Sequence, residues 1–220
     1  MNLRRRPTLR QCVPVSIARI AAASLVCGAA SFAHAATDNY SATGAEGQVF
    51  GAYALPDGCT TGYFEIVFSA QGTNSLNPQS TTPSAFAYIF GQNNCTHTYS
   101  FEDGYTNTLT FSASGNGSQL PPSITASGQI PMTGSSGADN LTFQITLNSI
   151  GPETRYLATT QNSYPQWGTN MVTVHTHSDS DSSQANASAS ISTQNLGALT
   201  LQNSYNQISS SRVHQVTVNH

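Results

Sequence analysis

Apolar and polar side chains alternate with a period of two over much of the chain beyond residue 35. In residues 141–148, leucine, phenylalanine and isoleucine alternate with threonine, glutamine and asparagine. Because successive side chains of a β-strand point to opposite faces of its sheet, this segment has one apolar and one polar face. Such alternation is typical of an antiparallel strand with one face on a core and the other in water.

Similar segments recur along the chain, separated by clusters of Gly, Pro, Asn and Ser. We find no convincing helical period beyond residue 35. The pattern predicts an all-β domain of about eleven or twelve short strands, an antiparallel β-sandwich of the jelly-roll or immunoglobulin-like kind. The segments are 49–55, 64–68, 86–90, 96–101, 109–113, 124–130, 141–147, 155–160, 171–175, 185–191, 199–201 and 213–218.

In one of these segments the aromatic residues Phe86, Tyr88 and Phe90 share one parity, which predicts that they face the core.

Two polar stretches interrupt the strand pattern. Residues 71–83 are rich in Gly, Asn, Ser, Thr and Pro, and residues 178–183 alternate Ser with Asp. Such compositions favour exposed loops.

The first 35 residues differ from the rest and have the three parts of an export signal. Arginines from Arg4 to Arg10 precede an apolar stretch, and small residues at 33–35 follow it. The apolar stretch is too short to span a bilayer. We therefore expect residues 1–35 to be a cleaved signal peptide rather than an uncleaved anchor. Residues 36–220 would then be a single domain, secreted or held in the periplasm or cell envelope, with no transmembrane segment.

The charges are distributed unevenly. Five of the seven basic residues lie in the first 35 positions, none of the seven is a lysine, and all ten acids follow. Only Arg155 and Arg212 oppose those acids, so the mature chain has a net charge of −8. A negative surface without a basic patch repels phosphate, which argues against nucleic acid as a partner and disfavours anionic membranes.

Four cysteines are present, and Cys12 and Cys27 lie within the predicted signal peptide. Cys59 and Cys95 remain as an even pair in an oxidising compartment. We therefore expect them to form a disulfide bond.

A candidate metal site lies near residue 180. His175, His177, Asp179 and Asp181 are two residues apart, so on an extended strand they would project from one side. Imidazole and carboxylate together suit a divalent metal ion, and His214 could add a ligand if the last strand is a neighbour. In the alternative interpretation both histidines face solvent and the aspartates begin an exposed loop.

A candidate ligand contact lies at Tyr164 and Trp167, which flank a turn-like Pro-Gln segment. Exposed aromatic rings can stack on a sugar or contact a peptide. Alternatively, Trp167 packs over the edge of the core.

We find no nucleophile motif or other catalytic group of residues in the sequence. The sequence therefore predicts a non-catalytic binding or surface module, with a glycan or a protein surface as partner and no cofactor. The alternatives are a metal-binding protein or metal-dependent secreted enzyme using His175 and His177, and a β-pore-forming toxin. The toxin interpretation rests on the alternation of Ser or Thr with small apolar residues in 188–193.

Overall fold

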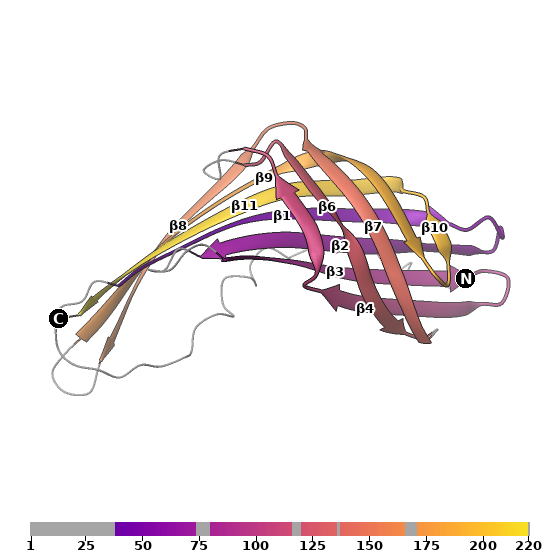
Figure 1. Ribbon diagram of the computed structural model, residues 1–220, viewed down its shortest axis with the longest axis horizontal. Helices are drawn as coiled ribbons and strands as arrows, with labels where there is room; N and C mark the ends of the chain where they lie inside the picture. The colour runs from indigo at the N-terminus through magenta and orange to yellow at the C-terminus, as the bar shows by residue number, and fades with distance from the viewer. Residues whose placement is uncertain (1–37, 74–79, 116–119, 136, 166–170, 220) are drawn as a thin grey trace, which may run out of the picture. The chain divides into compact units, whose positions relative to one another are not determined.

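A computed structural model describes residues 38–73, 80–115, 120–135, 137–165 and 171–219. The described residues form eleven strands and no helix, and all strand pairs are antiparallel (Figure 1). The predicted all-β, antiparallel fold is thus confirmed. The described part of the chain contains no helix of the length and apolarity needed to cross a membrane. The predicted signal peptide lies outside these residues.

The strands follow one another along the chain with short connections. They are β1 (Asp38–Ala54), β2 (Thr60–Thr73), β3 (Ser80–Asn93), β4 (Thr98–Thr106), β5 (Leu109–Ala113), β6 (Ser123–Gly134), β7 (Gly137–Ser149), β8 (Thr154–Pro165), β9 (Met171–Thr193), β10 (Gly197–Leu199) and β11 (Gln202–Asn219).

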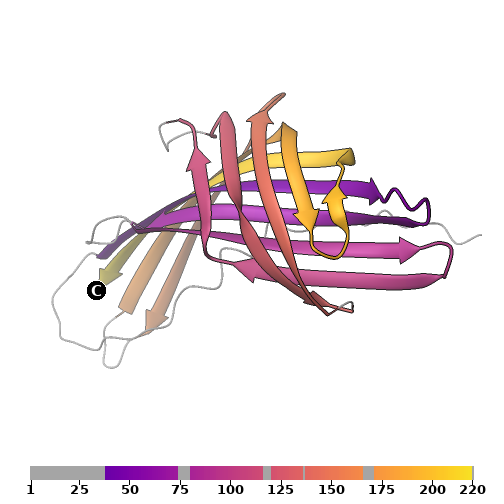
Figure 2. The same cartoon turned by 45° about the vertical axis from the view of Figure 1, so that its right-hand side comes forward.

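The strands belong to one sheet that closes on itself. β4 and β5 lie end to end along one edge of β6, and β7 and β8 lie end to end along one edge of β9. β10 and β11 share the other edge of β9, and β11 closes the sheet by pairing with β1. As a result, β5, β6 and β7 form a layer that crosses over β1 to β4, as in a sandwich (Figures 1 and 2).

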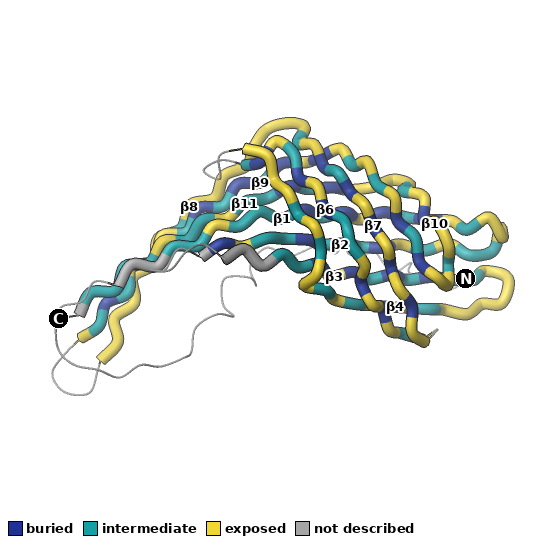
Figure 3. Tube along the Cα trace, viewed as in Figure 1, coloured by how far each residue is buried: buried dark blue, intermediate teal, exposed yellow. Residues whose placement is uncertain are grey.

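The core lies between these two layers. Phe64, Ile66 and Phe68 of β2 are fully buried, and so are Leu141 and Ile145 of β7. Figure 3 shows how buried positions alternate with exposed ones along β6, β7 and β9. Each fully buried side chain of this size contributes about 1.5–3 kcal/mol relative to an exposed one.

Glycine allows close packing at two points. A Cβ atom at Gly47 would overlap the ring of Phe68, and one at Gly134 would overlap the carbonyl of Phe101. The first glycine makes room for a core ring. The second lets β6 approach β4 where the two layers join.

Both predicted loops are wrong in their extent. Residues 178–183 lie in the middle of β9 and pair with strands on both sides. Of residues 71–83, β2 continues to Thr73 and β3 begins at Ser80. Ser and Thr tolerate extended backbone well, and the two aspartates of β9 find partners on neighbouring strands.

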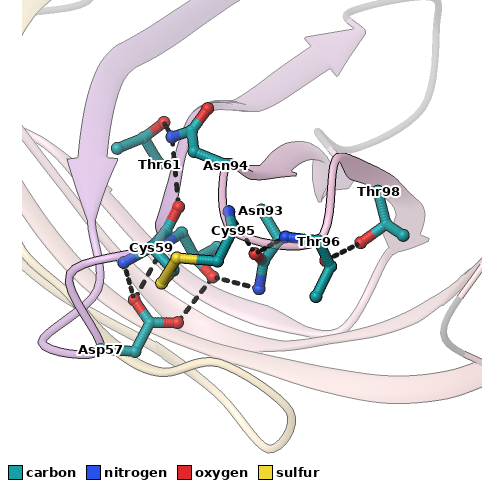
Figure 4. Close-up of a disulfide and its surroundings, with 9 residues drawn as sticks. Asp57, Cys59, Thr61, Asn93, Asn94, Cys95, Thr96 and Thr98 are labelled. Carbon is teal, nitrogen blue, oxygen red and sulfur yellow. Dashed lines mark hydrogen bonds between the residues drawn. A yellow bond between two sulfur atoms is a disulfide. The ribbon is translucent and has the colours of Figure 1, made fainter.

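The predicted disulfide bond is confirmed between Cys59 and Cys95, whose Cα atoms are 5.5 Å apart. It joins the turn between β1 and β2 to the turn between β3 and β4 (Figure 4). Asp57 Oδ1 accepts hydrogen bonds from the backbone N–H groups of Cys59 and Thr60. These bonds fix the first turn, and Asn93 does the same for the second.

We predict that replacing both cysteines, Cys59→Ser with Cys95→Ser, lowers the free energy of unfolding by about 3–4 kcal/mol, because the bond closes a long loop in the unfolded chain. Urea denaturation would measure the change. The wild-type protein under reducing conditions should show the same loss. An unchanged midpoint would show that the bond does not restrict the unfolded chain.

Candidate functional site

The four residues of the predicted metal site do share one side of β9, but their surroundings differ. His175 and His177 are exposed, whereas Asp179 and Asp181 are buried. His214 lies directly opposite His177 in the pairing of β11 with β9. Even so, the described residues contain no group of three or more His, Cys, Asp or Glu side chains that could hold a metal ion.

The two aspartates are instead paired with arginines. Arg155 of β8 contacts Asp179 through two parallel hydrogen bonds, from Nε to Oδ1 over 3.0 Å and from Nη2 to Oδ2 over 2.7 Å. Arg212 Nη2 of β11 lies 2.9 Å from Asp181 Oδ2 and 3.1 Å from Asp179 Oδ2. Buried carboxylates need such partners, because an unpaired buried charge is strongly unfavourable.

These contacts also favour the charged form of Asp179. The hydrogen bond from Arg155 lowers the pKa of Asp179, and the charges of Arg155, Arg212 and His177 lower it further, against the opposing effect of burial. Guanidinium groups therefore occupy the positions where a metal cation would have to bind. Both arginines of the chain beyond residue 35 are used in this cluster.

The second predicted site is described only in part. Tyr164 lies on β8 with 54% of its surface exposed. Trp167 lies outside the described residues, so the proposed pair of rings stays a prediction.

The structure reveals a different surface that the sequence patterns did not predict. Aromatic side chains gather on the outer side of the sheet, over β11 and β1 to β4, opposite the core. We call this surface the aromatic face. It consists of Phe50, Tyr63, Phe86, Tyr88, Phe90, Tyr99, Phe101, Tyr105 and Tyr205.

The rings of the aromatic face form a continuous series across four strands. The ring centre of Tyr63 lies 5.7 Å from that of Phe50, 6.1 Å from that of Tyr88 and 5.1 Å from that of Phe90. Phe90 in turn lies 6.0 Å from Tyr99. Several of the rings are well exposed, among them Tyr99 at 65% and Phe101 at 52%. A monomeric soluble protein seldom exposes a contiguous apolar surface that has no role.

The orientation of β3 explains why this face was missed. The prediction that Phe86, Tyr88 and Phe90 face the core is wrong, because Ala85, Ala87 and Ile89 are the buried set. The large core residues of β2 lie beside β3, whose own core positions hold two alanines and one isoleucine and no aromatic ring. The available signal was that residues 85–90 are apolar at both parities.

Polar groups between the rings carry negative charge or none. Gln48 Nε2 donates a hydrogen bond to Glu65 Oε1 over 2.6 Å, and Asp103 is exposed beside Tyr88. Burial raises the pKa of Tyr63, and its neighbour Tyr88 raises it further.

The arginine cluster lies on the other side of the sheet. On β11, Arg212 has the parity of buried Ile208, whereas Tyr205 has the opposite parity. The described part of the aromatic face therefore carries neither arginine.

No family model and no curated protein matches the sequence. Among solved structures, one match is an acetoacetate decarboxylase-like enzyme from Sphingomonas wittichii RW1, with 8% identity and a TM-score of 0.31. The match covers 83% of this chain and 93% of that one. So distant a likeness carries no argument about the fold or the chemistry of this chain.

The matched protein is an enzyme, so the comparisons give no support to the prediction of a non-catalytic module, and we do not carry the non-catalytic part of that prediction further. The metal-binding alternative loses its carboxylates to Arg155 and Arg212.

We predict that the ion pair of Asp179 makes stability depend on pH. The folded-state pKa of Asp179 is lowered, so the pair contributes fully above the ordinary aspartate pKa of about 4 and is lost as the pH falls through the lowered value. Arg155→Met should flatten this dependence. Melting temperatures between pH 2.5 and 6 would measure it.

The control is Asp179→Asn, alone and combined with Arg155→Met. Once the carboxylate is gone, the arginine substitution should add little to the pH dependence. Identical pH profiles for the wild-type protein and Arg155→Met would contradict the assignment.

Proposed function

We propose that the aromatic face binds a neutral polysaccharide chain. The observation that carries the proposal is the continuous series of exposed rings from Phe50 to Tyr99, with acceptor groups between them. The C–H face of a sugar ring packs on an aromatic ring, and its hydroxyl groups need hydrogen-bond partners at the edge. Glu65, Asp103 and the tyrosine hydroxyls supply such partners on this face.

The charge of the face supports a neutral ligand over an anionic one. Glu65 and Asp103 are acidic, and the described residues place both available arginines on the opposite side of the sheet. An anionic glycan, a nucleic acid or an anionic lipid surface would meet repulsion without a compensating cation. A neutral polymer with many hydroxyl groups meets no such cost.

The arrangement of the rings supports a polymer over a small molecule. The series runs across β1, β2, β3 and β4 on one side of a sheet, so several sugar units could stack in succession. Each contact is weak, and the affinity comes from their number.

The acetoacetate decarboxylase-like match does not enter this proposal, and we assign no reaction to the chain.

We also propose that the chain is exported, with residues 1–35 removed. The predicted signal features support this, and so does the disulfide bond between Cys59 and Cys95, because such bonds persist in oxidising compartments. Polysaccharides of cell walls and matrices are found on the same side of the membrane.

We predict that mature protein is retained by at least one insoluble neutral polysaccharide among cellulose, chitin and β-1,3-glucan. The double substitution Tyr63→Ala with Tyr99→Ala should weaken retention by tenfold or more, since each ring contributes about 1 kcal/mol. Depletion isotherms would measure the change.

The matched control is Tyr156→Ala with Leu157→Ala, which removes two exposed apolar side chains from β8, away from the aromatic face. Their exposure, 67% and 55%, is comparable to that of Tyr99. The control should bind like the wild-type protein. The proposal fails if no polysaccharide retains the protein, or if the two double variants bind alike.

We predict that the full-length gene, expressed in a Gram-negative host, yields exported protein that begins at Ala36. Intact-mass spectrometry would show the loss of residues 1–35 and of two hydrogen atoms for the disulfide. A mass that includes Met1 in the soluble cytosolic fraction would contradict export.

A further inference from the structure

We propose that a hollow beside Tyr205 binds one or two sugar units and so forms a subsite of the aromatic face. The inference rests on the proposed function and goes beyond it by naming the place where the polysaccharide is held specifically. The hollow has a volume of about 430 Å³ and is lined by residues of β9 and β11, together with Ile150.

The hollow exists because the closed sheet opens locally at this point. β9 pairs with β11 as far as Gln184, and its pairing with β10 begins only at Ile191. Between these points the first residues of β11 turn toward β1, where Tyr205 lies opposite Phe50. The hollow is therefore continuous with the aromatic face through Tyr205, whose ring is 47% exposed.

The polar groups of the hollow suit a neutral ligand. Gln184 and Asn186 present exposed amides from β9, and Ser204 presents a hydroxyl from β11. None of the hollow's lining residues carries a charge. Amides and hydroxyls both donate and accept hydrogen bonds, as sugar hydroxyls do.

A buried amide provides the second observation. Asn206 lines the hollow and is 7% exposed, and its Nδ2 donates to Ser204 Oγ over 3.1 Å. Its Oδ1 accepts a hydrogen bond from none of the described residues. Buried polar atoms are normally paired. The terminal torsion of asparagine is soft, so this oxygen can turn toward a ligand hydroxyl in the hollow.

The size of the hollow limits what it holds. Sites for small molecules typically measure about 300–1,000 Å³, and this one lies near the lower end of that range. It accommodates a short stretch of a polysaccharide rather than a long one. The rings of the aromatic face would then carry the remaining units.

The test measures the binding of soluble oligosaccharides to the mature protein by isothermal titration calorimetry. The probes are the tetrasaccharides of cellulose, chitin and β-1,3-glucan. Asn206→Ala and Asn186→Ala should each weaken binding of the recognised tetrasaccharide about tenfold, while retention on the insoluble polymer changes little.

The matched control is Asn148→Ala. Asn148 is an exposed asparagine of β7 directly opposite Asn186 in the strand pairing, and it is not part of the hollow. It should bind like the wild-type protein. Asn186 is itself exposed, so its substitution tests the hollow even if Asn206→Ala fails to fold.

The inference is overturned if both hollow variants bind the tetrasaccharide as the wild-type protein does. If the Tyr63 and Tyr99 double variant loses binding in the same experiment, the aromatic face remains the binding surface and only the subsite is rejected. If no tetrasaccharide binds, the subsite is rejected, and the retention assay alone decides on the aromatic face.

Discussion

The interior volume of the closed sheet is the constraint on which the other features depend. A closed sheet of about eight strands leaves an interior just wide enough for side chains to fill. Here Phe64, Ile66 and Phe68 of β2 take much of that space, with Leu141 and Ile145 on the facing strand. The neighbouring strand β3 places two alanines and Ile89 inside, but no aromatic ring. Its larger aromatic residues must then face outward, and the aromatic face is the result.

Because the chain beyond residue 35 has few positive charges, the ion pairs that stabilise the sheet also determine the charge of the aromatic face. Two buried aspartates of β9 need cationic partners, and the chain beyond residue 35 offers only Arg155 and Arg212. Both are used where β8, β9 and β11 run side by side. The same pairing leaves the aromatic face without a cation. The charge distribution that holds three strands together thereby also favours a neutral ligand for the proposed binding surface.

Structural features that depend on the local sequence pattern could be predicted, whereas features that depend on which strands lie side by side were missed. Alternation identified most of the strands, though not their full lengths, and the two cysteines identified the disulfide, because neither inference requires knowledge of which strands are adjacent. Segment 85–90 is apolar at both parities, so its orientation depends on the size of the β2 residues beside it. The Ser–Asp run of 178–183 resembles a loop until arginines more than twenty residues away are placed against it. The aromatic face combines five strands, and only residues 85–90, which are apolar at both parities, hint at it in the sequence.

The orientation of β3 can be measured directly by hydroxyl-radical footprinting of the mature protein, with peptic peptides quantified by mass spectrometry. The account predicts rapid oxidation of Phe86 and Phe101, which are 41% and 52% exposed, and protection of Phe64 and Phe68, which are fully buried. Phenylalanine serves as its own standard in this comparison, since all four residues have the same intrinsic reactivity. Protection of Phe86 and Phe101 to the level of the core residues would contradict the closed sheet with an outward aromatic face.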